Sequence, residues 1–160
     1  MFVLLNRLRR VRRELAVPAA SRPRSLAFRH VDAGSCNGCE HELAATANPF
    51  YDLQRFGLDV VASPRHADAL VVSGAVTKRM ATPLLRAYEA MPEPRLVVAL
   101  GDCARGHGHG LIADPAELAG PAEAILPVDL TIPGCPPSPQ RIANGLLEAL
   151  DFLTPMPSDR

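Results

Sequence analysis

The chain has 160 residues, of which 48% are apolar and 21% are charged. This composition is typical of a globular protein with a core of its own and excludes a disordered chain. Residues 1–30 contain eight arginines and one acidic residue, a net charge of +7, which leaves −7 on the rest of a neutral chain. Because nucleic-acid-binding domains concentrate positive charge on their folded body, nucleic acid is not an expected partner.

Residues 1–25 are predicted to form a basic amphipathic extension. A helix there would suit an anionic membrane surface or a partner protein, and the alternative is a solvated tail. The segment lacks the pattern of a secretion signal, which favours a cytoplasmic protein, with an organelle transit peptide as the alternative. The folded domain is expected over 26–153, followed by a tail at 154–160. The apolar residues that recur at helical spacing are Leu4, Leu8, Val11 and Leu15.

Five short segments rich in valine, leucine and isoleucine predict buried parallel strands. They cover residues 26–31, 58–63, 68–73, 95–101 and 128–132. Two hydroxyl-proline pairs predict helix starts, because the hydroxyl caps the helix and proline is tolerated at its first position. The predicted helices cover about 83–91, after Thr82, and about 139–152, after Ser138. Alternating strands and helices predict an α/β domain with a doubly wound parallel sheet.

Each cysteine follows a predicted strand. Cys36 and Cys39 come after the first strand, Cys103 after the fourth and Cys135 after the fifth. Because the carboxyl ends of parallel strands share one edge of an open sheet, the three loops are expected to bring the four thiols together. Residues 73–77, after another strand, are expected to wall the same edge. Glycines beside the cysteines allow close approach of a bulky ligand, and four thiolates match one [4Fe–4S] cluster.

Three other interpretations of the cysteines stay open at this point. Structural zinc sites commonly show two close pairs, whereas here one pair is followed by single cysteines after 63 and 31 residues. A thioredoxin-like disulfide would use Cys36 and Cys39 and leave Cys103 and Cys135 without a role. Small buried core residues are the third interpretation, although the last two cysteines lie in loops rich in glycine or proline.

Three motifs carry a resemblance to a known family. Residues 32–40 read Asp-Ala-Gly-Ser-Cys-Asn-Gly-Cys-Glu, residues 101–104 read Gly-Asp-Cys-Ala, and residues 133–137 read Pro-Gly-Cys-Pro-Pro. With these motifs, the chain resembles the small subunit of membrane-bound, energy-converting [NiFe] hydrogenases of the formate hydrogenlyase type. It is also similar to the cluster-bearing subunit of NADH-quinone oxidoreductase (complex I), from the same superfamily. The complex I relatives have adjacent cysteines at the first position, so the spacing of Cys36 and Cys39 favours the hydrogenase branch.

The resemblance implies a flavodoxin-like domain with one [4Fe–4S] cluster at the carboxyl edge of the strands, bound by Cys36, Cys39, Cys103 and Cys135. The chain would then be the electron-relay subunit of an oxidoreductase, with a nickel–iron centre in the large partner subunit. Further expected partners are a ferredoxin-like iron–sulfur subunit and membrane subunits that translocate ions. The expected location is peripheral, on the cytoplasmic face of the inner membrane. The alternative is the cluster subunit of a complex I-like NADH/quinone oxidoreductase.

Charged residues near the cysteines are candidates for supporting roles. Arg105 is a candidate for tuning the cluster potential, and the alternative is a surface pair with an acid. Glu40 and His41 are candidate proton relays toward the partner, and the alternative is that they cap or solvate the following helix. His107 and His109 have the spacing of metal ligands, but their glycine-rich loop favours a backbone role.

Overall fold

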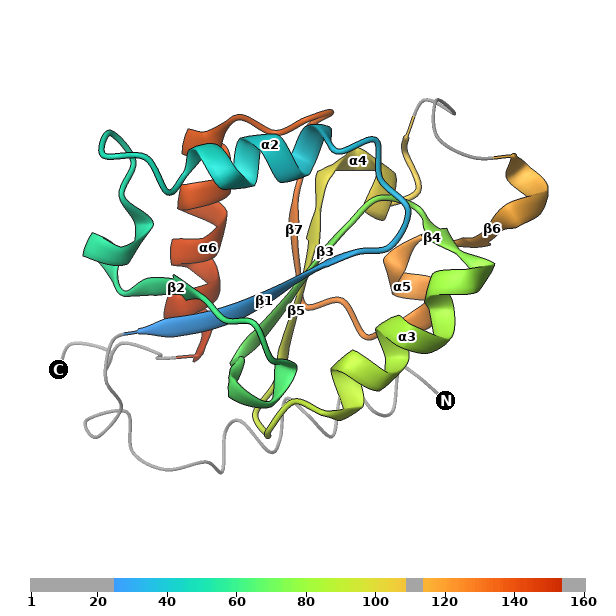
Figure 1. Cartoon of the computed structure of the whole chain (residues 1–160), viewed down its shortest axis with the longest axis horizontal. Helices are drawn as coiled ribbons and strands as arrows, with labels where there is room; N and C mark the ends of the chain where they lie inside the picture. The colour runs from blue at the N-terminus through green and yellow to red at the C-terminus, as the bar shows by residue number, and fades with distance from the viewer. Residues whose placement is uncertain (1–24, 109–113, 154–160) are drawn as a thin grey trace, which may run out of the picture.

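A computed structural model of the chain describes residues 25–108 and 114–153 (Figure 1). The strands of the main sheet are β1 (Leu26–Asp32), β2 (Leu58–Val60), β3 (Ala69–Ser73), β5 (Leu96–Leu100) and β7 (Leu130–Ile132). The α-helices are α2 (Gly38–Ala45), α3 (Lys78–Glu89), α4 (Gly101–Ala104), α5 (Ala122–Ile125) and α6 (Pro139–Leu153). The remaining elements are the short 3₁₀ helices η2 (Leu53–Phe56), η3 (Pro64–His66) and η4 (Pro115–Glu117), and the strands β4 (Val76–Thr77) and β6 (Leu118–Gly120).

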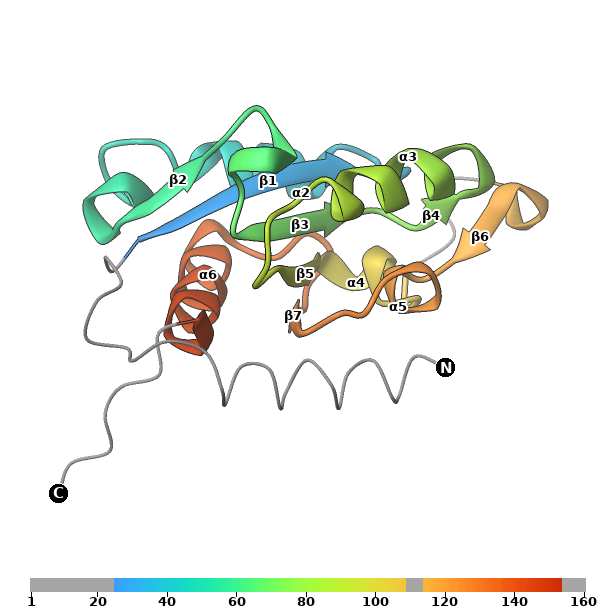
Figure 2. The same cartoon turned by 90° about the horizontal axis from the view of Figure 1, so that it is seen from below.

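All five predicted strands are present in one parallel sheet with the order β2-β1-β3-β5-β7. Figure 2 shows them side by side in this order. It is the strand order of flavodoxin-like sheets, and it reverses between β1 and β3. The predicted α/β fold with a parallel sheet is therefore confirmed. β2 ends at Val60 rather than at residue 63, because this edge strand pairs only with the first residues of β1.

Both faces of the sheet are buried, as expected for parallel strands. Every residue of β3 and of β5 is buried, and successive side chains point to opposite faces. One face packs against α2 and α6, through residues such as Leu43 and Leu146. The other packs against α3 and α5, through residues such as Leu84 and Ala122. Figure 1 shows these two helical layers on opposite sides of the sheet.

The two predicted helix starts have different outcomes. α6 begins directly after Ser138, as predicted. The predicted start of the other helix at Pro83 is wrong, because α3 begins at Lys78 and Pro83 lies inside it. The physical reason is an earlier cap, since the Thr77 hydroxyl accepts a hydrogen bond from the Met80 amide at 3.3 Å.

Some features lie beyond the predicted elements. The antiparallel pair of β4 with β6 was not predicted, because strands of two and three residues are too short to show a hydrophobic period. Residues 1–24 and 154–160 lie outside the described residues, so the amphipathic N-terminal helix stays a prediction. Among the residues that the structure describes, no helix combines the length and hydropathy needed to cross a membrane.

Candidate functional site

The structure brings the four cysteines to one edge of the sheet. Cys36 lies in the loop after β1, Cys39 at the start of α2, Cys103 in α4, and Cys135 in the loop between β7 and α6. All four are free thiols. Burial, together with the charges of Glu40 and of the other three cysteines, raises the pKa of Cys39 to about 12. The four thiols are therefore close enough to interact electrostatically.

Asp32 shapes the loop that carries the first two cysteines. Its Oδ1 accepts hydrogen bonds from the amides of Gly34 and Ser35, both at 2.8 Å. The segment after β3 packs closely against this turn, since a Cβ on Gly34 would lie 2.6 Å from the side chain of Thr77. Residues 73–77 therefore wall this edge, as predicted.

Asp102 ties the second and third cysteine loops together. Its amide donates a hydrogen bond to the carbonyl of Gly134 at 2.8 Å, and the Gly134 amide donates to its Oδ1 at 3.0 Å. The same carboxylate oxygen accepts a bond from Arg105 Nη1 at 3.1 Å. This clasp holds Cys103 near Cys135. Burial raises the pKa of Cys103, and the charge of Cys135 is the next largest cause.

Glycine is required where the backbone passes the thiols. Gly101 has a φ of +84°, and a Cβ there would lie 2.6 Å from Cys39 Sγ. A Cβ on Gly108 would lie 2.5 Å from Cys103 Sγ. Larger side chains would occupy the space beside the thiols, so the glycines keep that space open to a bound group.

The donor set fits an iron–sulfur cluster in its chemistry, because cysteine thiolates are the ligands such clusters use. Burial and mutual repulsion oppose thiolate formation at Cys39 and Cys103, and bound iron cations would offset both effects. Within residues 25–108 and 114–153, no group of three or more His, Cys, Asp and Glu side chains is arranged to hold a single metal ion.

Glu40, the candidate proton relay, contacts two residues of the sheet from the first turn of α2. The Ser73 hydroxyl donates a short hydrogen bond to Glu40 Oε1. His30 Nε2 lies 2.9 Å from Ser73 Oγ and 3.5 Å from Glu40 Oε1. Burial lowers the pKa of His30, opposed in part by the charges of Glu40 and Asp32. The three side chains therefore form one polar cluster at the end of β3.

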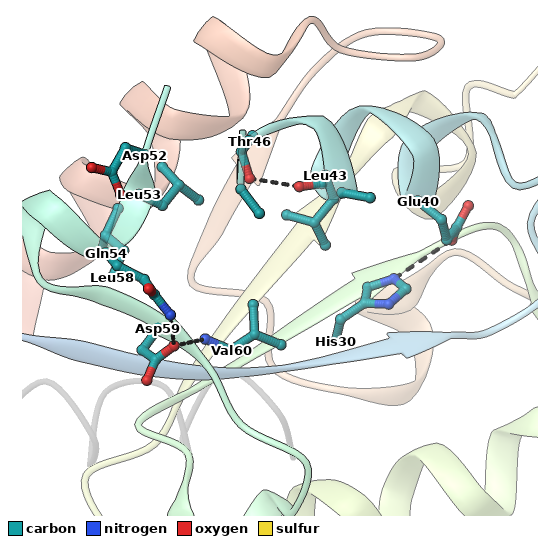
Figure 3. Close-up of a pocket in the computed structure, with 12 residues that line it drawn as sticks. His30, Glu40, Leu43, Thr46, Asp52, Leu53, Gln54, Leu58, Asp59 and Val60 are labelled. Carbon is teal, nitrogen blue, oxygen red and sulfur yellow. Dashed lines mark hydrogen bonds and ion pairs between the residues drawn. The ribbon is translucent and has the colours of Figure 1, made fainter. Parts of the chain in front are cut away.

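His30 and Glu40 also line a cavity of about 450 Å³ bordered by α2, η2 and β2 (Figure 3). Its wall is apolar in part and carries two further acids. These lining residues include Leu43, Leu53, Leu58, Asp52 and Asp59. The polar cluster thus borders a cavity on the side of the sheet covered by α2.

The structure shows no contact of the other candidate residues, where it describes them, that supports the roles predicted for them. His41 and His107 are exposed, and His109 lies outside the described residues. The His107 amide donates a hydrogen bond to the Asp102 carbonyl at 2.8 Å, which is a backbone role. Arg105 forms an ion pair with Asp102, the pairing that the sequence offered as the alternative to a tuning role.

Sequence reasoning missed His30, and it missed the side-chain roles of Ser73 and Asp102, which it named only within residues 73–77 and the motif at 101–104. Ser73 and Asp102 carried a usable signal, because both lie at the carboxyl end of a predicted strand, where ligands of open sheets bind. His30 lies inside β1, where nothing in the local sequence distinguishes it from a residue that only packs.

Two solved structures share this fold. A chain of the membrane-bound sulfane sulfur reductase, an archaeal respiratory membrane complex, matches with a TM-score of 0.71 and 28% identity, over 88% of this chain and 77% of that chain. A chain of an NAD⁺-reducing [NiFe]-hydrogenase shares the fold with a TM-score of 0.60 and 21% identity, over 84% of this chain and 96% of that chain. The fold is thus one found in hydrogenases and in a respiratory membrane complex.

The sequence comparisons then give the family. Residues 36–149 match the family described as NADH ubiquinone oxidoreductase, 20 Kd subunit, and the chain belongs to it. It is 45% identical over 130 residues to formate hydrogenlyase subunit 7 of Escherichia coli (strain K12), covering 81% of this chain and 50% of that protein. This chain therefore spans about half the length of that relative.

Two further relatives represent both branches of the family. The probable membrane-bound hydrogenase subunit mbhJ of Pyrococcus furiosus is 45% identical over 127 residues, 79% of this chain and 75% of that protein. A subunit of the NADH-quinone oxidoreductase of Carboxydothermus hydrogenoformans is 45% identical over 111 residues, 69% of this chain and 66% of that protein. The predicted family is confirmed, and its members are subunits of oxidoreductases.

Proposed function

We propose that this chain is the electron-transfer subunit of a membrane-bound [NiFe] hydrogenase complex of the formate hydrogenlyase type. The observation that carries the proposal is the convergence of four free thiols from three loops at the carboxyl edge of the sheet. The 45% identity to two hydrogenase subunits supports the hydrogenase branch. The two residues between Cys36 and Cys39 support it as well.

One [4Fe–4S] cluster is proposed at this edge. Bound there, it supplies a one-electron carrier between the nickel–iron centre of a large subunit and a ferredoxin-like iron–sulfur subunit. The chain's own part is to hold the thiols in place. The Asp32 turn sets the first loop, and the Asp102 clasp joins the other two. The proposed ligands are Cys36, Cys39, Cys103 and Cys135.

The proposed partners are that large subunit, the ferredoxin-like subunit and membrane subunits that translocate ions. The name of the Pyrococcus relative, a probable membrane-bound hydrogenase subunit, supports a peripheral position at a membrane. We place the chain on the cytoplasmic face of the inner membrane. Residues 1–25 would contact the membrane surface or a partner through their apolar stripe.

Glu40 is proposed as a proton relay between solvent and the large subunit. Its place beside Cys39 and at the wall of the cavity supports this role. The test is Glu40→Gln in the purified complex, with Glu42→Gln on the same helix as the control. Because a positioned acid or base contributes about 10²–10⁴-fold, hydrogen turnover should fall by at least about 10²-fold at unchanged iron content. Full turnover in Glu40→Gln would end this role, and exposed His41 would be the next candidate.

The second candidate function is that of the cluster subunit in a complex I-like NADH/quinone oxidoreductase. The 45% identity to the Carboxydothermus NADH-quinone oxidoreductase subunit and the family match favour it. The two candidates differ in the metal content of the large subunit, since only a hydrogenase carries nickel. The chain's part in electron transfer is the same in both.

The deciding experiment is an analysis of nickel, iron and zinc in the complex that co-purifies with the full-length chain from gently solubilised membranes under anaerobic conditions. Nickel and iron together support the hydrogenase, iron without nickel favours the complex I-like enzyme, and zinc alone overturns both. Each single Cys→Ser variant should lose or convert the cluster signal in electron paramagnetic resonance, whereas Ser63→Ala, remote from the thiols, should keep it.

A further inference from the structure

We infer that His30 and Ser73 are positioning residues for Glu40, which fix one oxygen of its carboxylate through two successive hydrogen bonds. The inference rests on the proposed function, because the relay role is what makes the orientation of Glu40 matter. It extends that function to two residues of the sheet that lie outside the three cysteine motifs.

The direction of the hydrogen bonds follows from the donors that are present. Ser73 has one hydroxyl hydrogen and gives it to Glu40 Oε1. Its oxygen therefore accepts a bond from His30 Nε2, 2.9 Å away. Burial lowers the pKa of His30, which favours the neutral ring, and the bond to Ser73 requires that this ring carry its hydrogen on Nε2. The bonds thus run in one direction, from His30 through Ser73 to Glu40.

The register of the sheet explains why these residues meet. In the pairing of β1 with β3, Asp32 lies opposite Ser73, and His30 lies opposite Val71. Because side chains alternate along a strand, His30 is on the same face as Asp32 and therefore on the face that Ser73 shares. Ser73 is fully buried, which keeps its hydroxyl in one place. The strand order also reverses between β1 and β3, where open sheets form their ligand crevice.

This arrangement leaves the second carboxylate oxygen of Glu40 without a partner among the residues that the structure describes. Glu40 Oε2 is buried, and no described residue gives it a hydrogen bond. Figure 3 shows it turned away from His30. A buried acceptor without a partner costs about 1–3 kcal/mol, so the side chain would rotate unless other contacts held it. The hydrogen bond from Ser73, whose oxygen is in turn held by His30, supplies that hold on the Glu40 side chain.

The test measures the infrared absorption of the Glu40 carboxylate. Infrared difference spectra of the full complex, with the Glu40 band assigned by its loss in Glu40→Gln, report on the hydrogen bonds of this group. Ser73→Ala and His30→Phe should shift the band, and His30→Gln should restore it, because the amide nitrogen of glutamine replaces the Nε2 donor. Exposed His66→Gln is the matched control and should leave the band unchanged.

Two outcomes would overturn the inference: an unshifted band in both Ser73→Ala and His30→Phe, or a shifted band that His30→Gln does not restore. Ser73 is fully buried, so Ser73→Ala can fail to fold. Because His30 is partly exposed, the two variants His30→Phe and His30→Gln are sufficient to test the inference without it. Full turnover in Glu40→Gln would contradict the relay role of Glu40 but would not change the band shifts in the His30 and Ser73 variants. The relay role and the positioning role are therefore tested independently. Iron content and the cluster signal should equal those of the parent complex in every variant scored.

Discussion

The carboxylate of Asp102 accepts a hydrogen bond from the amide of Gly134, 32 residues further along the chain, at 3.0 Å. The bond joins the loop of Cys103 to that of Cys135. Asp102→Ala should therefore lower the iron content of the purified complex and destabilise the chain by about 1.5–3 kcal/mol, the usual contribution of a hydrogen bond to a charged group.

The conservative change Asp102→Asn keeps an acceptor for Gly134 and should retain most of the iron. Asp114→Ala, at the cap of η4, removes a carboxylate that serves a different turn. Iron analysis and thermal unfolding of these three variants measure the effect. Equal iron in Asp102→Ala and the parent would show that the clasp does not hold the thiols.

Arg105 lies two residues after Cys103 and pairs with Asp102. Arg105→Ala should lower the midpoint potential of the cluster, because a reduced cluster gains negative charge that a nearby cation stabilises. The effect should be on the order of tens of millivolts, since a partly exposed charge contributes about 1 kcal/mol and ~1.4 kcal/mol corresponds to ~59 mV for one electron. A redox titration followed by electron paramagnetic resonance measures it. Arg105→Lys should keep the parent potential, and an unchanged value in Arg105→Ala would assign the arginine to the surface pair alone.

Gly101→Ala separates backbone strain from crowding of a thiol. The φ of +84° costs a non-glycine residue about 1–3 kcal/mol, and the added Cβ would lie 2.6 Å from Cys39 Sγ. Gly106, at a φ of +81°, offers the matched control, because a Cβ there would meet only Pro121 at 3.3 Å. Both variants should lose similar stability in thermal unfolding, while only Gly101→Ala should lose iron. Equal iron in the two would mean that the space beside Cys39 is not needed.

The pKa of His30 is lowered from its ordinary value of 6.5, chiefly by burial. Between this folded value and 6.5 the unfolded chain binds more protons, so the free energy of unfolding falls as the pH drops through that window. Glu40 and Asp32 oppose the shift and Arg29 adds to it. His30→Gln should flatten this part of the stability profile of the full-length chain, whereas exposed His66→Gln should not. Parallel profiles of His30→Gln and the parent would contradict the assignment.

The sequence predicted the sheet well because the strands are continuous apolar runs, such as Leu96–Leu100, that are buried on both faces. The convergence of the cysteines followed from the same strands, since each loop leaves a carboxyl end. The start of α3 was missed because two threonines, Thr77 and Thr82, offer caps, and only the three-dimensional contact of residues 73–77 with the first loop favours the earlier one. The hydrogen bonds that join His30, Ser73 and Glu40 could not be predicted from the sequence, because they depend on the register between β1 and β3.

Cys135 follows β7, and within the part of the chain that the structure describes β7 is an edge strand that pairs with β5. A growing polypeptide that has not yet reached residue 130 already contains three of the thiols but lacks the strand that places the fourth. The complete set of thiols therefore arises only after translation of the last strand and its packing under α6. Under the proposed function, cofactor insertion requires a chain that has been synthesised through β7 and α6, so the order of the strands places insertion after the synthesis of these elements.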